Sequence, residues 1–242
     1  MSGRLFVGTS GFGYPAWSPR FYPPGTRGTG LLPYYASRLP AVELNGTYYR
    51  QPSAKTVASW LLATPPGFRF VVKALRSGSS RAFATDPAST LPWLLDPARH
   101  LGERLGAVLF RVGEERPRDD ARLDAFLAAW PRELPLALEF RHPSWIDDAV
   151  LTRLQEAGAV LCATDASEDV EPPTIRRTGP FLYLRLRRDD YDDAEIDAWA
   201  RRVEPFLSDG SDVFVFFKHD PVGRGADLAL ALAERSPGQT SN

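Results

Sequence analysis

The chain has 242 residues, a formal net charge of −1 and 43% hydrophobic side chains, which is enough apolar material for one sizeable core. We therefore predict a single domain over residues 1–242, with a disordered tail at about 237–242. The balanced charge excludes a nucleic-acid partner that is held by global charge, and the apolar stretches are too short for a signal peptide or a membrane span, which indicates a cytoplasmic protein of bacterial type with no membrane partner.

Eight short apolar runs recur along the chain at regular spacing. They are residues 5–8, 42–45, 68–73, 107–111, 136–141, 159–165, 181–187 and 213–218. Stretches with helical periodicity separate most of them, at 31–39, 54–63, 93–105, 121–130, 146–157, 195–207 and 226–234. Alternating strands and helices predict a parallel sheet, and eight such units in this length fit an α/β (β/α)8 barrel, the TIM-barrel fold.

The sixth crossover, residues 166–179, departs from this alternation. Glu171-Pro172-Pro173 lies in its middle, and proline both lacks a backbone N–H and clashes with the preceding helical turn. We therefore predict a loop or a short turn here, so that the sixth crossover is degenerate.

Charged residues lie near the C-terminal ends of most runs, at positions that strand alternation places inward. These inward positions are Glu43, Asn45, Lys73, Arg111, Glu139, Arg141, Asp165, Arg185, Arg187 and Lys218. Cations outnumber carboxylates among them, and an unpaired buried cation costs several kcal/mol. The surplus favours an anionic ligand in the pocket. The alternative is a structural ring of ion pairs that caps the core.

The single cysteine, Cys162, lies in the middle of the sixth run. Its parity places it against the helices if Asp165 faces the pocket. Because a reactive thiolate needs partial exposure and a nearby cation, we interpret Cys162 as a core residue.

Two loops strengthen the prediction of a ligand. The segment after the first run carries Ser10, Tyr14 and Trp17 among glycines and prolines up to about residue 30, which is typical of a lid or a stacking platform. The alternative is that its rings fill the barrel mouth as a satellite core. Before the last helix, Gly223 and Gly225 favour a phosphate site, where free backbone N–H groups and the helix dipole can hold an anion.

Metal-ligand signals are sparse. The chain has three histidines, which does not support a zinc site of several histidines. A carboxylate-rich Mg²⁺ or Mn²⁺ site is the alternative. Its ligands would come from Glu43, Glu139, Asp165 and His142 or His219. The cofactor therefore stays unknown at this stage, with a divalent metal as one alternative.

Five motifs follow one another in order: VGTSGF at 7–12, YYAS at 34–37, VELNGTYYR at 42–50, FVVKA at 70–74 and EFRHPSW at 139–145. Together they resemble the YecE-like family, a catalogued domain of unknown function, over nearly the whole chain. The resemblance implies a (β/α)8 fold distantly similar to the endonuclease IV and xylose isomerase barrels, with no settled activity.

The resemblance also implies a set of recurrent polar positions. In this chain they are Glu43, Asn45, Tyr49, Lys73, Glu139, Arg141, His142 and Trp145. The last two strands depart from the family pattern, with 185–188 reading RLRR where many members have RLHG, and 218–220 reading KHD where others often have NND. The first half of the site therefore follows the family more closely than the second.

The hypothesis that we favour is an enzyme, a hydrolase or an isomerase, that acts on a phosphorylated sugar or another small phosphoester. Its catalytic residues are predicted to be Glu43, Lys73, Glu139, Arg141, His142 and Asp165. Its substrate-binding residues are predicted to be Ser10, Tyr14, Trp17, Asn45, Tyr49, Arg111, Trp145, Arg185, Lys218, Gly223 and Gly225. Glu43 and Glu139 would act as base or orienting groups, and the cations would clamp the substrate.

The second hypothesis is a nucleic-acid-binding or repair protein distantly similar to endonuclease IV. Tyr14, Trp17, Tyr48 and Tyr49 would then stack on unpaired bases while the cations contact phosphates. A non-catalytic binding barrel is a third alternative. A fold hosts many reactions, so the fold alone does not name the reaction. The surplus of inward cations favours a small anionic molecule as the partner.

Overall fold

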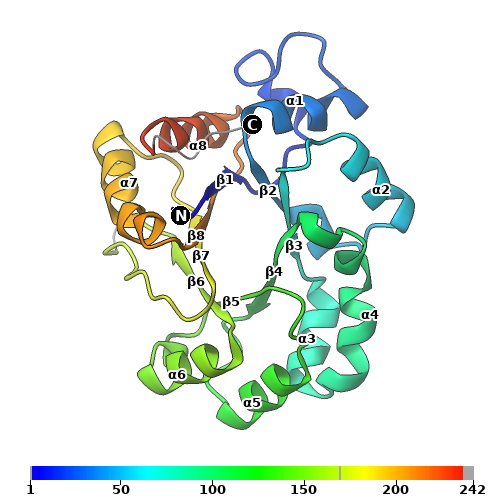
Figure 1. Cartoon of the computed structure of the whole chain (residues 1–242), viewed down its shortest axis with the longest axis vertical. Helices are drawn as coiled ribbons and strands as arrows, with labels where there is room; N and C mark the ends of the chain where they lie inside the picture. Colours follow the sequence, from blue (N-terminus) through cyan, green and yellow to red (C-terminus); the bar gives the residue numbers. More distant parts are fainter. Residues whose placement is uncertain (1, 169, 237–242) are drawn as a thin grey trace.

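The computed structural model describes residues 2–168 and 170–236, and the tail predicted at 237–242 lies outside them. Eight strands form one sheet in the order β1-β8-β7-β6-β5-β4-β3-β2, with every neighbouring pair parallel. Their bounds are β1 Leu5–Thr9, β2 Ala41–Leu44, β3 Arg69–Lys73, β4 Leu105–Val112, β5 Leu136–Phe140, β6 Val160–Asp165, β7 Phe181–Leu186 and β8 Asp212–Phe217. The strands form a central ring with the helices outside it (Figure 1), which confirms the predicted (β/α)8 fold.

The barrel is closed between its first two strands. Ser10 and Glu43 form a single parallel bridge, and the backbone N–H of Gly11 donates to the carbonyl of Glu43 at 2.7 Å. Close approach of the two backbones requires glycine at position 8, because a Cβ there would lie 1.9 Å from the carbonyl oxygen of Ala41. Glu43 therefore lies at the seam, directly beside Ser10.

The outer layer contains eight α-helices in the described residues. They are α1 Leu31–Arg38, α2 Ala54–Leu62, α3 Arg76–Ala84, α4 Pro87–Arg99, α5 Asp120–Ala129, α6 Asp148–Ala157, α7 Asp193–Ser208 and α8 Arg224–Glu234. Helix α7 begins with a full capping box. The carboxylate of Asp192 accepts the backbone N–H of Glu195, and the carboxylate of Glu195 accepts the backbone N–H of Asp192. Side chains also cap the starts of α2, α4, α5 and α6, at Ser53, Asp86, Asp119 and Asp147.

The third crossover differs from the sequence prediction, which expected one helix at 93–105. It contains two helices, α3 and α4, and α4 begins at Pro87 with Asp86 as its N-cap. The RSGSSRAFA sequence of α3 has weak helix propensity, so its helicity comes from packing, with Ala82 and Phe83 buried. Helix α4 continues through Pro92 and Pro97, where propensity rules expect an end or a kink.

The sixth crossover lacks a helix in its described residues, as the two prolines predict. Figure 1 shows this segment as a loop in the gap between α6 and α7. Thr178 anchors it to β6, since its hydroxyl accepts from the N–H of Leu161 at 2.8 Å and donates to the carbonyl of Ala159 at 2.9 Å.

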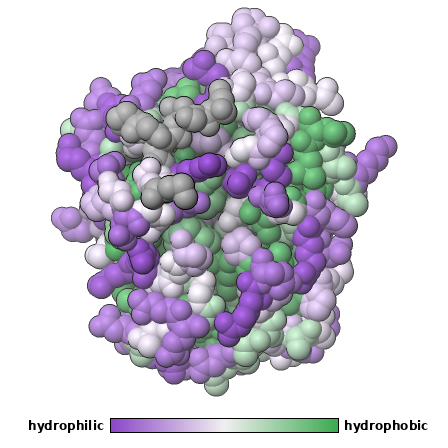
Figure 2. Space-filling model, in the orientation of Figure 1, coloured by the Kyte–Doolittle hydropathy of each residue, from purple (hydrophilic) through white to green (hydrophobic). Residues whose placement is uncertain are grey.

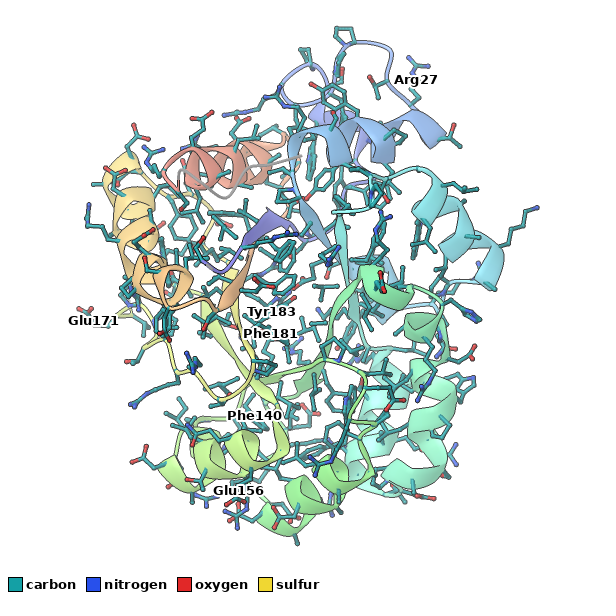
Figure 3. The ribbon with its side chains drawn as sticks, in the orientation of Figure 1. Arg27, Phe140, Glu156, Glu171, Phe181 and Tyr183 are labelled. Atoms are coloured by element: carbon teal, nitrogen blue, oxygen red, sulfur yellow. The ribbon has the colours of Figure 1, made fainter. Side chains whose placement is uncertain are left out.

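The strands separate two buried clusters. The inner cluster fills the barrel with Phe6, Ala41, Val71, Ala107, Leu109, Ala137, Val160, Cys162, Phe181, Tyr183, Phe214 and Phe216. Phe181 and Tyr183 lie within the ring of strands in Figure 3. Cys162 therefore lies inside the barrel, and the prediction that it faces the helices is wrong. Burial raises the pKa of its thiol, so it remains a core residue.

No helix in the described part of the chain is long and apolar enough to cross a membrane. Hydrophilic residues cover most of the face seen in Figure 2, with smaller apolar areas between them. The cytoplasmic location itself stays a prediction.

Candidate functional site

A buried ion triad lies at the C-terminal end of the barrel interior. Arg185 of β7 reaches between Glu43 of β2 and Glu139 of β5. Its Nη2 and Nε donate to the two oxygens of Glu43 at 2.8 and 2.9 Å, and its Nη1 donates to Oε1 of Glu139 at 2.9 Å. All three residues are at most 4% exposed. Removing Arg185 would leave both carboxylates without their buried counter-ion.

Neutral side chains complete the hydrogen bonds of this triad. Ser10 and Tyr183 each donate a hydroxyl to Glu43 at 2.8 Å, and Thr164 donates to Glu139 at 3.0 Å. Each oxygen of Glu43 therefore accepts two hydrogen bonds. This degree of satisfaction makes Glu43 a positioning residue for Arg185 rather than a free base.

The two carboxylates are ionised at neutral pH. Burial by itself would raise the pKa of Glu43, but the charge and the hydrogen bonds of Arg185 outweigh it and lower the pKa to about 2. Burial likewise opposes ionisation of Glu139, whose pKa is lowered mainly by the charge of Arg185. Neither group is suited to donate a proton near pH 7.

Four cations lie around the triad of Glu43, Arg185 and Glu139 at the barrel mouth. They are Lys73, Arg111, Arg141 and Arg187. Arg111 and Arg141 lie 3.8 Å from Glu139 in looser ion pairs. Lys73 is 8% exposed and places Nζ 4.3 Å from the ring centre of Tyr48, and in the described residues its amine forms no hydrogen bond or ion pair. Arg187 donates to Ser10 at 2.7 Å and likewise has no carboxylate partner there.

Lys73 is the cation whose charge state is most readily changed. Burial and the neighbouring charge of Arg185 lower the pKa of its amine to about 8, against the opposing effects of Glu43 and Glu139. Roughly a tenth of this amine is therefore neutral at pH 7, whereas the surrounding guanidinium groups stay protonated.

Two atoms at the inner edge of the site lack partners. Oε2 of Glu139 and Nε of Arg111 are enclosed and form no hydrogen bond in the described structure, although they face each other at 3.8 Å. A buried donor and acceptor left open in this way cost free energy. They mark this edge as a place where a ligand or a water molecule can add hydrogen bonds.

Beside Ser10, Tyr14 and His219 form a stacked pair with ring centres 5.1 Å apart. The hydroxyl of Tyr14 donates to the carbonyl of Ser10 at 3.2 Å, and Nδ2 of Asn45 donates to the same carbonyl at 3.3 Å. Burial and the charge of Arg187 lower the pKa of His219. A neutral imidazole therefore lies beside the cationic cluster.

Clefts open beside Tyr14 and beside three of the four cations. One of about 820 Å³ borders Tyr14, one of about 390 Å³ borders Arg111, one of about 600 Å³ borders Arg141 and one of about 330 Å³ borders Arg187. These volumes span the range of small-molecule sites.

Asp165 does not face the pocket, contrary to its predicted parity. Its carboxylate accepts hydrogen bonds from Nε of Arg188 at 3.0 Å and from the hydroxyl of Tyr191 at 3.1 Å, on the helix side of the barrel. Thr164 is the inward residue of this strand, in register with Arg185. The predicted catalytic role of Asp165 therefore has no geometric support. Its removal from the inner set enlarges the cationic surplus.

Lys218 lies at the outer rim. Its amine pairs with Asp189, and 41% of its side chain is exposed. It lines the same cleft as Arg187, away from the buried triad.

Both predicted substrate-binding tryptophans are structural. The indole N–H of Trp17 donates to the carbonyl of Asp220 at 2.8 Å, and that of Trp145 donates to the carbonyl of Arg116 at 2.9 Å. Each is at most 2% exposed. Trp17 packs against Phe21 and Tyr22, so the satellite core describes this loop better than a lid does.

The glycine loop before α8 is not a free phosphate site. Asp220 accepts the backbone N–H groups of residues 222–225 at 2.7–3.0 Å, and its pKa is lowered by these bonds in spite of burial. The donors that would bind a phosphate at Gly223 and Gly225 are therefore occupied by a carboxylate of the chain itself.

Two further predicted residues lie outside the cluster. Nδ1 of His142 accepts the backbone N–H of Ser144 at 3.2 Å, which caps the short helix that follows. Tyr49 is 79% exposed and contacts the ring of Tyr48 edge-on. Neither is in contact with the triad.

The carboxylate-rich metal alternative fits this geometry poorly. The guanidinium of Arg185 already occupies the space between Glu43 and Glu139, and Asp165 lies on the other face of the sheet. Residues 2–168 and 170–236 contain no group of three or more potential metal ligands.

Sequence reasoning left Tyr183 and Thr164 out of the site, and it placed Arg187 among the inward cations without assigning it a role. Tyr183 and Arg187 lie two positions before and after Arg185, so the same alternation that selects Arg185 selects them. Thr164 could be found only with the correct parity of β6.

Comparisons with known proteins agree with this fold. Residues 6–241 match the model of the family described as "Protein of unknown function DUF72". The chain is 24% identical to the UPF0759 protein YunF of Bacillus subtilis over 95% of this chain and 94% of that protein. Crystal structures of DUF72 family proteins superpose on it: one from Enterococcus faecalis with a TM-score of 0.79 at 23% identity, covering 99% and 96% of the two chains, and one from Thermotoga maritima with a TM-score of 0.78 at 25% identity, covering 96% and 98%. None of these descriptions carries the YecE-like name, which stays a prediction.

Proposed function

We propose that this protein, a member of the DUF72 family, is an enzyme that acts on a phosphorylated sugar or another small phosphoester. Because the function of that family is unknown, the proposal rests on the site. One observation carries the proposal. Lys73 and Arg187 are largely buried beside the triad, yet neither has a carboxylate partner in the described residues. Because an unpaired buried cation costs several kcal/mol, an anion is the natural partner of these two cations.

The residues divide into two roles under this proposal. Glu43, Arg185 and Glu139 form a rigid charged floor, because every hydrogen bond of Glu43 is made within the protein. Lys73 and Arg187 neutralise the phosphate, with Arg111 and Arg141 at the edge of the site. Electrostatic groups held in place before the substrate arrives stabilise charge that develops during reaction.

The test is a thermal-shift panel at low salt with inorganic phosphate, sugar phosphates, nucleotides, and single-stranded and abasic DNA. A ligand at about 100 times its dissociation constant adds roughly 2.7 kcal/mol, which raises the midpoint of a chain of this size by about 5–10 °C. We expect this shift with a small phosphoester and its loss in Lys73→Met. The exposed Arg38 at the end of α1 supplies the matched control, Arg38→Met, which keeps the shift.

A nucleic-acid ligand is the second candidate, favoured by the exposed ring of Tyr49 beside Tyr48. It predicts a shift with single-stranded or abasic DNA that disappears as salt rises. A shift with the small phosphoester that survives at higher salt supports the first proposal. Binding without turnover of any tested phosphoester would instead support a non-catalytic binding barrel.

A further inference from the structure

Lysine is rare in this chain. Only Lys55, Lys73 and Lys218 are present among 29 cationic side chains. Lys55 is exposed on α2 and Lys218 pairs with Asp189 at the rim. Lys73 is the one that lies buried at the barrel mouth.

Its neighbours show that charge alone does not require lysine here. Arg111, Arg141, Arg185 and Arg187 supply the other cations of the cluster. Arginine binds phosphate in a fork geometry and stays protonated in proteins, so it serves as a permanent clamp. Lysine differs in one respect that matters chemically: its amine can lose a proton and become a nucleophile.

The surroundings of Lys73 suit a nucleophile. Its Nζ lies on the ring of Tyr48 and forms no hydrogen bond within residues 2–168 and 170–236. This nitrogen is not fully enclosed, so it reaches solvent. The hydroxyl of Thr47 donates to the carbonyl of Lys73 at 2.7 Å and fixes the strand end. Tyr48, whose ring lies against this amine, also lines a cleft of about 390 Å³ together with Arg111, and a small carbonyl compound fits a cleft of this size.

We propose that Lys73 forms an imine with an aldehyde or ketone group of the phosphorylated substrate. The inference rests on the proposed function, because Arg187 and the edge arginines hold the phosphate while Lys73 reacts. It deepens that function by naming the substrate class: small phosphorylated carbonyl compounds, such as open-chain sugar phosphates.

The step balances without any further reactant. The lone pair of neutral Nζ attacks the carbonyl carbon, a C–N bond forms and the C=O π pair moves to oxygen. Both protons of the amine leave with that oxygen as water, and a C=N bond remains. No oxidant or reductant takes part, and the reverse reaction with water restores the lysine.

The protonation equilibrium agrees with this chemistry. Burial and Arg185 lower the pKa of the amine to about 8, so the reactive neutral form is accessible near neutral pH. A lysine desolvated next to another cation is a known route to an activated amine.

The experiment uses three related probes on the full chain. Pyridoxal 5′-phosphate has both the phosphate and the aldehyde, pyridoxine 5′-phosphate keeps the phosphate without the aldehyde, and pyridoxal keeps the aldehyde without the phosphate. After incubation and reduction with sodium borohydride, intact mass and peptide mapping locate any adduct. We expect one adduct on Lys73 with pyridoxal 5′-phosphate, and competition by pyridoxine 5′-phosphate.

Variants identify the reacting amine. Lys73→Arg should lower labelling by at least about tenfold because arginine is not deprotonated, while binding of pyridoxine 5′-phosphate persists and shows that the variant is folded. Lys55→Arg, on the exposed face of α2, should label like the wild type.

The outcomes separate the two proposals. If pyridoxine 5′-phosphate binds but the adduct falls on Lys55, Lys218 or the N-terminal amine, the imine proposal is overturned and the phosphate site stands. If neither phosphorylated probe binds, the proposed function fails. Labelling by pyridoxal alone then decides the imine separately: an adduct on Lys73 supports it, and its absence overturns it.

Discussion

Replacing Arg185 by methionine tests the organisation of the site most severely. Arg185→Met keeps the volume of the side chain roughly constant and removes the buried cation that pairs with both Glu43 and Glu139. Breaking a buried pair by removing one partner costs about 3–5 kcal/mol. For a chain of this size each kcal/mol corresponds to about 2–4 °C, so the midpoint of thermal unfolding should fall by roughly 6–20 °C.

The same magnitude follows from protonation. The pKa of Glu43 is lowered from 4.5 to about 2, and at about 1.4 kcal/mol for each tenfold change in the proton equilibrium this corresponds to about 3 kcal/mol at neutral pH. In Arg185→Met, the strongest effect that opposes burial is removed, so the pKa of both carboxylates rises. The stability gap between variant and wild type should therefore narrow as the pH falls and the carboxylates bind protons.

The assay is urea unfolding at pH 7 and at pH 5, followed by tryptophan fluorescence. Arg141→Met is the matched control, because Arg141 lies 3.8 Å from Glu139 but has 30% of its side chain exposed, and it should lose less than about 1 kcal/mol. If Arg185→Met is no less stable than Arg141→Met at pH 7, the buried triad does not act as described.

Three further predictions concern the frame around the site. Wild-type stability should be full above pH 4.5 and fall by about 3 kcal/mol through protonation of Glu43 as the pH approaches 2, and a flat acid profile in urea titrations would refute the lowered pKa. Asp220→Ala should lose about 1–2 kcal/mol in urea unfolding, since it leaves the start of α8 uncapped, and unchanged stability would contradict the cap. Asp165→Asn should lower the thermal midpoint but leave the response to phosphate unchanged; loss of that response would place Asp165 back in the pocket.

The sequence correctly predicts which residues face into the barrel for strands in which a charged residue alternates with large apolar ones. Glu43, Glu139 and Arg185 all follow this pattern, because an ion is tolerated on the inner face only where partners from other strands meet it. Their mutual pairing could not be predicted, since it depends on register between strands far apart in the sequence.

The sixth strand failed for a physical reason. Asp165 ends the strand and looks like the other inward charges, but it is satisfied from the helix side by Arg188 and Tyr191, which come from the loop after β7. The inward position belongs to Thr164, a small neutral residue without any distinctive signal. Parity assigned from a terminal charge therefore reversed the whole strand, Cys162 included.

Loops were predicted least well because their contacts are remote. The glycines at 223 and 225 suggested a phosphate site, but the carboxylate of Asp220 occupies their N–H groups. The aromatic loop suggested a lid, but Trp17 is buried against residues about 200 positions away, through its bond to Asp220. Sequence pattern identifies such groups as special without telling which partner satisfies them.

The most direct measurement is a calorimetric titration of inorganic phosphate into the wild type, Arg187→Met and Arg38→Met. Arg187 lies at the mouth beside Ser10 with no carboxylate partner in the described residues, whereas Arg38 is exposed at the end of α1. Loss of one charged hydrogen-bonding partner of the phosphate should weaken binding by about 1.5–3 kcal/mol, or roughly tenfold to a hundredfold, in Arg187→Met alone. Equal affinity in all three proteins, or no binding to the wild type, would contradict an anion site at the barrel mouth.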